Sequence, residues 1–270
     1  MIQRSFTYPG GKAHLSDWII SNMADHTLYV EPFCGSAAVL LNKNPSKQEV
    51  LNDIDGNITF FFETLRDRKS ELIEYLNNTP YSYNIYKRIV QDYYSGHYPD
   101  DPIERAGQFY FLRYAQFGAK ADAPAGFSRP SGQNSAPANK FKNSQKNLEY
   151  IASRLHYVHF DNLDYIEIIE RYDDVTTLFY CDPPYKGTEK RYSNYEFNHD
   201  VFIDKMKNID GKFILSYDHD MPDWDWTKCL KDSHNHIGQG GATTEYLYMN
   251  YDPNHERLFQ GHEQTSIVDY

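Results

Sequence analysis

The sequence has little cysteine and no long hydrophobic run. Its three cysteines, Cys34, Cys181 and Cys229, are too few and too scattered for a disulfide framework or a zinc site, which favours a reducing cytoplasm. No apolar run approaches the roughly 18 residues that indicate a membrane span, and residues 1–12 lack the apolar stretch of a signal peptide. The eleven histidines show no H-E-x-x-H or similar spacing. We therefore expect a cytoplasmic protein with neither a membrane partner nor a bound metal.

Basic residues are in the minority. The chain has 27 lysines and arginines against 38 acidic residues, a net charge of −11, which argues against indiscriminate binding to nucleic acid. However, residues 105–154 contain eight basic and only two acidic residues, a net charge of +6, while the remainder carries −17. This asymmetry indicates a segment that faces a polyanion, although a solvated basic surface would give the same count.

The length and the hydrophobic pattern indicate an α/β protein. A chain of 270 residues with 40% hydrophobic residues suffices for one large domain, or for one domain with an insertion. Short buried strands alternate with helices, which is typical of a mainly parallel sheet. We expect strands at 27–31, 49–52, 157–160, 177–181, 212–216 and 245–250, and helices at 37–43, 55–76, 163–171 and 201–208.

The middle of the chain breaks this alternation. Residues 83–116 are rich in tyrosine and have a helical pattern, whereas residues 119–143 are polar and contain glycines and prolines that no regular element should span. A loop of this length in a compact protein is usually functional. We expect a catalytic domain formed by residues 1–77 and 151–255, a helical insertion at 78–150 and a polar tail at 256–270.

One candidate binding site follows the first expected strand. A turn with one glycine, Gly35, opens the next helix and allows a ligand to approach the backbone at the end of the strand. Asp53 lies 18 residues further, at the end of the second strand, where a carboxylate can accept hydrogen bonds from ribose hydroxyls. The turn lacks the G-x-G-x-x-G cradle of nicotinamide enzymes. On spacing alone, a purely structural turn remains an alternative.

A second candidate is the run Asp182-Pro183-Pro184-Tyr185, which directly follows the expected strand at 177–181. Each residue of this run has a physical role if the substrate is an exocyclic amine such as N6 of adenine, which is a poor nucleophile because its lone pair is delocalised into the ring. The Asp182 carboxylate and the Pro183 carbonyl could both accept hydrogen bonds from this amine and orient it. Two prolines restrict the backbone and offer no competing N–H donor, and the Tyr185 ring could stack on a base. The alternative is a rigid corner with an incidental acid.

Six short motifs, in this order, resemble the D12 class of adenine-N6 DNA methyltransferases, and most closely its phage and prophage branch. The resemblance covers about residues 5–220, and the strand TEYLYMNY at 244–251 fits the end of the same fold. The motifs are PGGK at 9–12, EPFCGSAAVLL at 31–41, LNDID at 51–55, DNLDY at 161–165, DPPY at 182–185 and ILSYD at 214–218.

The resemblance implies a Rossmann-like α/β fold that uses S-adenosylmethionine, with the insertion serving as a small helical target-recognition domain on double-stranded DNA. It also implies site residues. Tyr8 and Lys12 match the N-terminal cofactor motif, with Lys12 near the methionine carboxylate, and Phe33 and Gly35 match the glycine turn. Asp53 matches the acid that binds the ribose, and Asp164 and Tyr165 match the element beside the adenine of the cofactor. The catalytic motif is matched by Asp182, Pro183, Pro184 and Tyr185, and Asp182 is also expected to touch the cofactor.

The implied reaction is direct methyl transfer to adenine N6 of a flipped-out base, with no covalent enzyme intermediate and no metal. Cytosine-N4 methylation needs the same geometry, but its motif more often begins with serine, so Asp182 favours adenine. RNA methylation and protein glutamine methylation are weaker alternatives. A non-catalytic DNA-binding relative is another, against which the intact Asp53 and Asp182–Tyr185 argue.

The insertion supplies the expected DNA contacts. It contains RYAQFGAKADAPAGFSRPSG at 113–132 in place of the R-x-N-x-x-G-x-F-N-type stretch of GATC readers, so the recognised sequence stays open. The enzyme could serve a cognate restriction endonuclease or act as an orphan. We expect phosphate contacts from Lys140, Lys142 and Lys146, base contacts from Arg113, Gln116 and Arg129, and a further DNA contact from Lys120.

Overall fold

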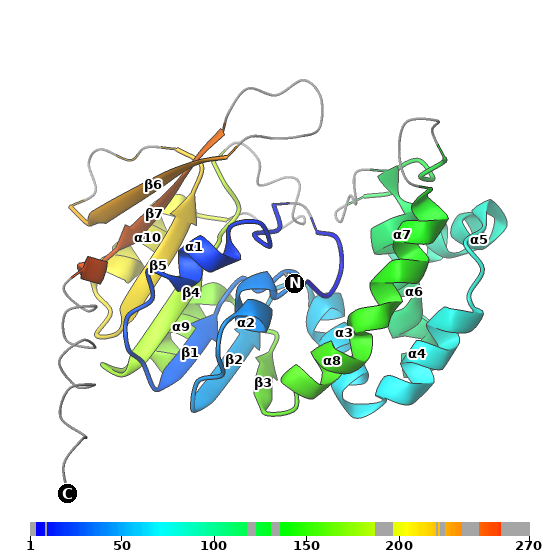
Figure 1. The fold of residues 1–270 in the computed structure, drawn as a ribbon, viewed down its shortest axis with the longest axis horizontal. Coiled ribbons are helices and arrows are strands. Elements are labelled where there is room, and N and C mark those ends of the chain that lie inside the picture. The colour runs from blue at the N-terminus through cyan, green and yellow to red at the C-terminus, as the bar shows by residue number, and fades with distance from the viewer. Residues whose placement is uncertain are drawn as a thin grey trace, which may run out of the picture.

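The structure is a computed structural model that describes residues 4–8, 10–117, 123–130, 136–186, 197–219, 221, 225–233 and 243–254 (Figure 1). A twisted sheet with helices on both faces forms one side of the molecule, and a group of helices packs beside it. Within the described residues, no helix is both long enough and apolar enough to cross a membrane.

The sheet has seven strands in the order β3-β2-β1-β4-β5-β7-β6. Neighbours from β3 to β5 pair in parallel, while β7 runs antiparallel between β5 and β6. This mixed α/β sheet agrees with the methyltransferase fold that the sequence resemblance implies. The strands are β1 (Leu28–Glu31), β2 (Gln48–Asn52), β3 (Val158–Asp161), β4 (Thr177–Cys181), β5 (Lys212–Tyr217), β6 (Thr227–Ser233) and β7 (Thr243–Met249).

Helices cover both faces of the sheet because successive strand side chains point to opposite sides. Leu178 and Tyr180 of β4 pack on one face with α1, α2 and α3, whereas Phe179 and Cys181 pack on the other with α9 and α10. Both faces are therefore apolar, as expected for parallel strands. The helices of this layer are α1 (Ser16–Ile20), α2 (Ala38–Asn42), α3 (Gly56–Asp67), α9 (Tyr165–Tyr172) and α10 (His199–Lys207).

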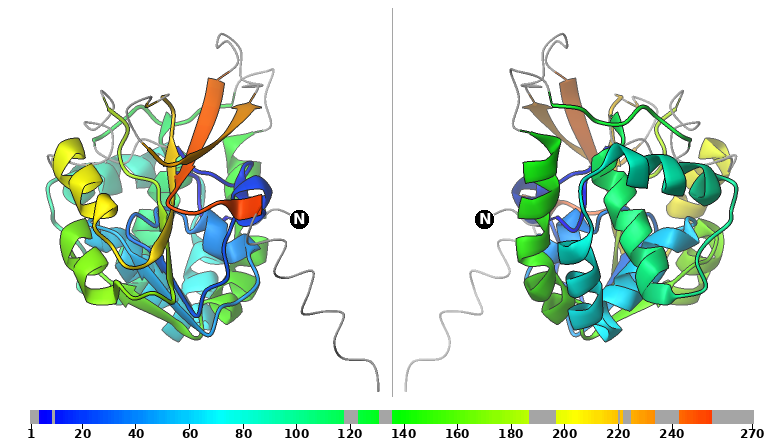
Figure 2. Two further views of the ribbon diagram at one scale, coloured as in Figure 1. Left: turned by 90° about the vertical axis from the view of Figure 1, so that its left-hand side faces the viewer. Right: turned by 90° about the vertical axis from the view of Figure 1, so that its right-hand side faces the viewer.

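A further group of helices lies between β2 and β3 in the chain and packs against α3 through α6 and α8 (Figure 2). Its buried side chains belong to the same apolar cluster as one face of the sheet. The division of the chain at residues 77 and 150 stays a prediction, since α4 also packs on α6 and α8. The group consists of α4 (Lys69–Asn78), α5 (Tyr83–Tyr94), α6 (Pro102–Ala115), α7 (Pro137–Ser144), the 3₁₀ turn η2 (Gln145–Asn147) and α8 (Leu148–Arg154).

A buried carboxylate fixes the return of this helical group to the sheet. Glu49 of β2 accepts hydrogen bonds from Lys43 Nζ at 2.6 Å and from Arg154 Nη1 at 2.5 Å, and Arg154 Nη2 also donates to the carbonyl of Leu40 at 3.0 Å. All three charged side chains are at most 9% exposed. The last residue of α8 is therefore tied to the strand from which the helical segment departs.

Two expectations about local structure are wrong. The helix expected over 55–76 is two helices, because the backbone of Arg68 leaves the helical region and separates α3 from α4. The polar stretch at 119–143 does contain regular structure, since α7 begins at Pro137, in the first helical turn, where the missing N–H of proline costs nothing. Strand β6 was not expected; it completes the antiparallel edge of the sheet.

Candidate active site

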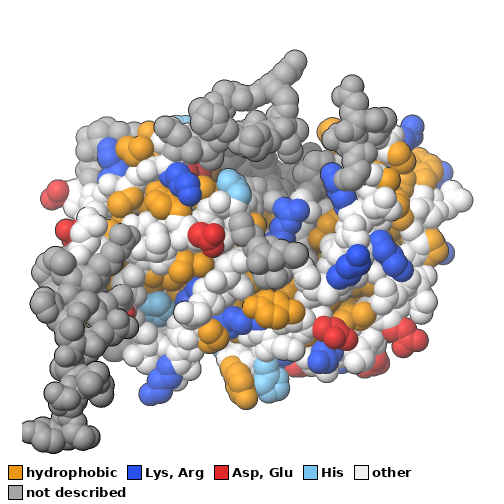
Figure 3. All heavy atoms as spheres, in the orientation of Figure 1, with side chains coloured by type: hydrophobic (Ala, Val, Ile, Leu, Met, Phe, Trp, Pro, Cys, Tyr) orange, Lys and Arg blue, Asp and Glu red, His pale blue; other side chains and the backbone are white. Residues whose placement is uncertain are grey.

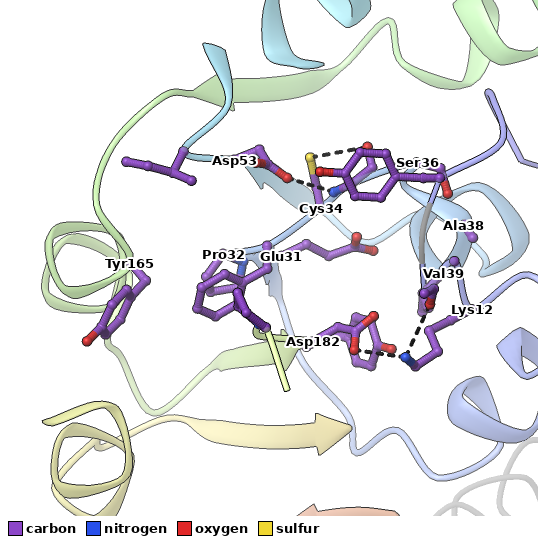
Figure 4. Close-up of a pocket in the computed structure, with 18 of the residues that line it drawn as sticks. Lys12, Glu31, Pro32, Cys34, Ser36, Ala38, Val39, Asp53, Tyr165 and Asp182 are labelled. Atoms are coloured by element: carbon purple, nitrogen blue, oxygen red, sulfur yellow. Dashed lines mark hydrogen bonds and ion pairs between the residues drawn. The ribbon is translucent and has the colours of Figure 1, made fainter. Parts of the chain in front are cut away.

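A pocket that is partly open to solvent lies at the carboxyl ends of β1, β2 and β4 (Figure 4). The strand order reverses between β1 and β4, and ligands of open α/β sheets bind at such a point. Asp53 and Asp182 lie on opposite sides of the pocket, with Glu31 between them. The geometry therefore joins the two candidate sites of the sequence into one pocket.

The turn after β1 forms the floor of this pocket and requires glycine. Gly35 has a φ of +47°, and a Cβ at this position would lie 3.1 Å from Cδ1 of Tyr8. A side chain would therefore be strained by its backbone and crowded by the Tyr8 ring. The N–H of Gly35 donates to Oδ2 of Asp53 at 2.9 Å, so the turn also holds the carboxylate that follows β2.

Asp53 is a buried carboxyl group that lines the pocket. Its Oδ1 accepts from the N–H of Asp55 at 3.0 Å, in addition to the bond from Gly35. Burial and the nearby Asp55 carboxylate raise the pKa of Asp53 to about 7, although both backbone hydrogen bonds favour the charged form. Asp53 thus titrates near neutral pH, and its remaining lone pairs are available to a ligand.

Glu31, at the end of β1, was not among the predicted site residues. Its Oε1 accepts from Tyr29 Oη and from the N–H of Leu40, each at 2.9 Å. Burial raises the pKa of Glu31 to about 8. The signal for this residue was present in the sequence: an acid that ends an apolar strand and precedes the glycine turn.

Aromatic side chains form one end of the pocket. The rings of Phe33 and Tyr165 lie 5.7 Å apart, and the ring of Phe197, which was not predicted as a site residue, lies 5.0 Å from that of Tyr165. The Asp164 carboxylate lines the pocket and caps α9 by accepting from the N–H of Ile166 at 2.8 Å. This end offers flat apolar surfaces beside a hydrogen-bond acceptor, which suits a purine ring.

The opposite end carries a cluster of charged and hydroxyl groups. Lys12 Nζ lies 3.0 Å from Oδ1 of Asp182 and donates to Tyr185 Oη at 2.5 Å. Burial raises the pKa of Asp182; Lys12 opposes this rise, and the neighbouring Glu245 reinforces it. Pro184 lines the pocket and Pro183 is buried behind it. The position of Lys12 near a methionine carboxylate stays a prediction; in the structure its amine pairs with the catalytic motif.

Two of the predicted base-contacting residues are buried in the structure, and their contact with bases stays a prediction. Arg113 is 1% exposed and Gln116 is 3% exposed, and both donate to Tyr94 Oη, at 3.1 and 2.6 Å. Arg113 also stacks on the ring of Phe109. The sequence pattern could not reveal this, because arginine is usually exposed.

The remaining predicted DNA-binding residues behave differently. Arg129, Lys140, Lys142 and Lys146 are exposed, whereas Lys120 lies outside the described residues. Figure 3 shows Lys and Arg side chains gathered over the run from α7 to α8, beside the hollow between the sheet and the helical group. Arg105 stacks on Phe60 and Tyr98, so the basic stretch supplies fewer free charges than the sequence count indicates.

The matches to known proteins agree with this site. A family model described as D12 class N6 adenine-specific DNA methyltransferase matches residues 8–231. The type II methyltransferase M.MjaIII of Methanocaldococcus jannaschii is 25% identical over 77% of this chain and 82% of its own length. The DNA N-6-adenine-methyltransferase of Escherichia phage P1 is 24% identical over 76% of the chain but 27% of its own length. The DNA adenine methylase of Escherichia coli is 26% identical over 66% of the chain and 63% of its own length. The chain belongs to the D12 class of N6 adenine-specific DNA methyltransferases.

Proposed function

We propose that this chain binds S-adenosylmethionine in the pocket between Asp53 and Asp182 and methylates N6 of an adenine flipped out of double-stranded DNA. One observation carries the proposal: the glycine turn, the ribose-type carboxylate, and Asp182 and Pro184 of the D-P-P-Y motif line a single pocket at the switch point of the sheet. When bound, S-adenosylmethionine supplies a methyl group on a positively charged sulfur. The chain's own residues bind, align and exclude water.

The pocket residues fit this cofactor. The aromatic end formed by Phe33, Tyr165 and Phe197 suits an adenine ring, and Asp53 suits the two ribose hydroxyls. The absence of a side chain at Gly35 lets the Tyr8 ring, which also lines the pocket, pack against the turn. The methionine end would lie toward Lys12 and Asp182, where an amine and a carboxylate of the protein can meet a carboxylate and an amine of the ligand.

Asp182 has the role of orienting the target amine. Its carboxylate accepts one N–H of the amine and the Pro183 carbonyl the other, which directs the nitrogen lone pair toward the methyl group. Because adenine N6 is paired within duplex DNA, the base must leave the stack to reach the pocket. Cytosine-N4 methylation is disfavoured by the acid that begins this motif. The cognate DNA sequence and the presence of a partner restriction endonuclease stay open.

The decisive experiment is to sequence the modified bases in plasmid DNA from cells that express the chain. We expect N6-methyladenine in one sequence context, and no modification in cells that express Asp182→Ala. N4-methylcytosine in its place would identify the alternative reaction, and unmodified DNA with the folded wild-type chain present would contradict the proposed function.

Asp53→Ala should weaken the binding of S-adenosylmethionine by about tenfold or more, equivalent to about 1.4 kcal/mol. Asp53→Asn should be intermediate, because its amide oxygen accepts a hydrogen bond without the charge. Isothermal titration calorimetry measures both affinities. Unchanged values in both variants would place the ribose elsewhere, and a micromolar signal from added NAD would instead support a dinucleotide site.

The same affinity should depend on pH. Ribose hydroxyls donate to the carboxylate, while the pKa of about 7 leaves Asp53 largely protonated at pH 6. Binding then carries the cost of deprotonation, so affinity should rise by up to about tenfold per pH unit toward pH 7 and level off above pH 8. Asp53→Asn should abolish this rise. Glu31→Gln is the matched control, since Glu31 titrates in the same pocket at about pH 8; it should keep the rise below pH 7.

A further inference from the structure

Glu245 lies at the start of β7, and the topology brings this end of the strand to the active site. Strand β7 runs antiparallel to β5, with Tyr246 paired to Tyr217 and Leu247 paired to Ser216. Its amino end therefore reaches the edge of the sheet at which the parallel strands have their carboxyl ends. No motif of the sequence identified Glu245 as a site residue.

Three side chains from three different parts of the chain converge on one oxygen of Glu245. Its Oε1 accepts from Ser216 Oγ at 2.5 Å and from Tyr185 Oη at 2.6 Å, and it lies 3.4 Å from Lys12 Nζ. The Glu245 side chain is 13% exposed. Two of these partners, Lys12 and Tyr185, also contact Asp182, so each of them links Glu245 to the proposed catalytic carboxylate.

The number of protons available decides how these groups can pair. Tyr185 has a single hydroxyl proton. It has two carboxylate acceptors within reach, Asp182 at 3.1 Å and Glu245 at 2.6 Å. The shorter contact favours donation to Glu245. If Glu245 could not accept, the phenol would turn its proton toward Asp182 and occupy an acceptor position that the target amine requires.

We propose that Glu245 is a positioning residue for methyl transfer: it accepts the hydroxyl protons of Tyr185 and Ser216 and so keeps the Asp182 carboxylate available to the target amine. The inference rests on the proposed function and names a further residue of the same site. The negative charge of Glu245 also favours methyl transfer. Lys12 faces two carboxylates, so the group formed by Lys12, Asp182 and Glu245 carries a net charge of −1 when both carboxylates are ionised. Such an environment stabilises the positive charge that the amine gains as it is methylated.

The variant that tests this is Glu245→Gln, whose amide can donate to Tyr185 and thereby redirect the phenol proton to Asp182. We expect kcat to fall by about tenfold or more, while the affinity for S-adenosylmethionine and the KM for DNA stay within about twofold. Lys12, Tyr185 and Glu245 face Asp182, and the Glu245 charge raises the pKa of Asp182. Its removal should therefore move the acid limb of the kcat–pH profile to lower pH, which a purely structural defect would not do.

A double-mutant cycle with Tyr185→Phe isolates the proposed contact. Without the phenol proton, Glu245→Gln should cause a smaller further loss of kcat, namely the part that its charge contributes. The matched control is Glu170→Gln, which removes the same charge from a surface pair with Lys205 at 3.0 Å and should leave kcat and the pH profile unchanged.

Each outcome of these experiments decides between the alternatives. Wild-type kcat and pH profile in Glu245→Gln, or losses that multiply independently in the double variant, would overturn the inference. If Glu245→Gln fails to bind S-adenosylmethionine, the variant Glu245→Asp takes its place. The shorter aspartate side chain keeps the charge but moves the acceptor away from Tyr185 and Ser216, so kcat should fall with an unchanged pH profile. A wild-type kcat in Glu245→Asp would again overturn the inference. Absence of methylation by the wild-type chain would instead contradict the proposed function.

Discussion

Asp182→Ala is expected to abolish measurable methyl transfer while the chain still binds S-adenosylmethionine. The loss of a charge-assisted hydrogen bond to the target amine costs about 1.5–3 kcal/mol. Misalignment of the amine adds to this, because a displacement of about 1 Å can lower a rate by about a hundredfold. Lys12 retains Glu245 at 3.4 Å as a partner, so the variant leaves no isolated buried cation. Single-turnover methylation of duplex DNA and calorimetry measure the two effects separately.

Asp182→Asn refines this experiment, because it preserves the size of the side chain but replaces one acceptor with a donor that opposes the amine. It should also lose most of the turnover. The matched control is Asp161→Asn: Asp161 ends β3, accepts from Tyr172 Oη at 2.7 Å and is not among the residues lining the pocket. Near-normal turnover in both Asp182 variants would remove this carboxylate from the mechanism.

The second large effect concerns DNA affinity. Replacing Lys140, Lys142 and Lys146 together with glutamine should flatten the dependence of log affinity on log salt by about two to three units, since each neutralised phosphate contributes about 0.9. At low salt the affinity should fall on the order of a hundredfold for all sequences alike, because phosphate contacts carry no sequence information. All three lysines are exposed. Fluorescence anisotropy over a salt series measures the slope.

A second triple variant provides the control. Lys47, Lys69 and Lys207 are also exposed, but they lie before β2, at the start of α4 and at the end of α10, away from the pocket edge of the sheet. Their replacement changes the net charge equally and should leave the slope nearly intact. Equal flattening by both variants would indicate only a general charge effect. A full slope in the first variant would place the DNA elsewhere.

The candidate pocket could be predicted from the sequence because its residues follow strands. Asp53 and Asp182 directly follow β2 and β4, and parallel strands end at one edge, so motifs far apart in the chain had to meet. Glu245 was missed for the opposite reason: it begins its strand, and only the antiparallel direction of β7 brings that end to the pocket.

The DNA-binding residues were harder to predict because charge does not specify exposure. Arg113 follows Phe109 by one helical turn and stacks on it within the helical group, whereas Lys140 and Lys142 of α7 face solvent. The basic residues of this stretch that the structure describes therefore include both buried and exposed side chains. Only tertiary packing separates them, and of the predicted base-contacting residues Arg129 is the exposed one.

The placement of the helical group has a consequence for how far this segment can vary in sequence and length. The segment from α3 to α8 leaves β2 and returns to β3, and these two strands are hydrogen-bonded neighbours. The sheet therefore closes in the same way whatever the length of this crossover, and doubling a flexible connection costs only about 0.6 kcal/mol. The Glu49–Arg154 pair fixes the returning end independently of what precedes it. Residues of α4–α7 can thus be exchanged or lengthened, with α3, α8 and the sheet retained as a constant frame.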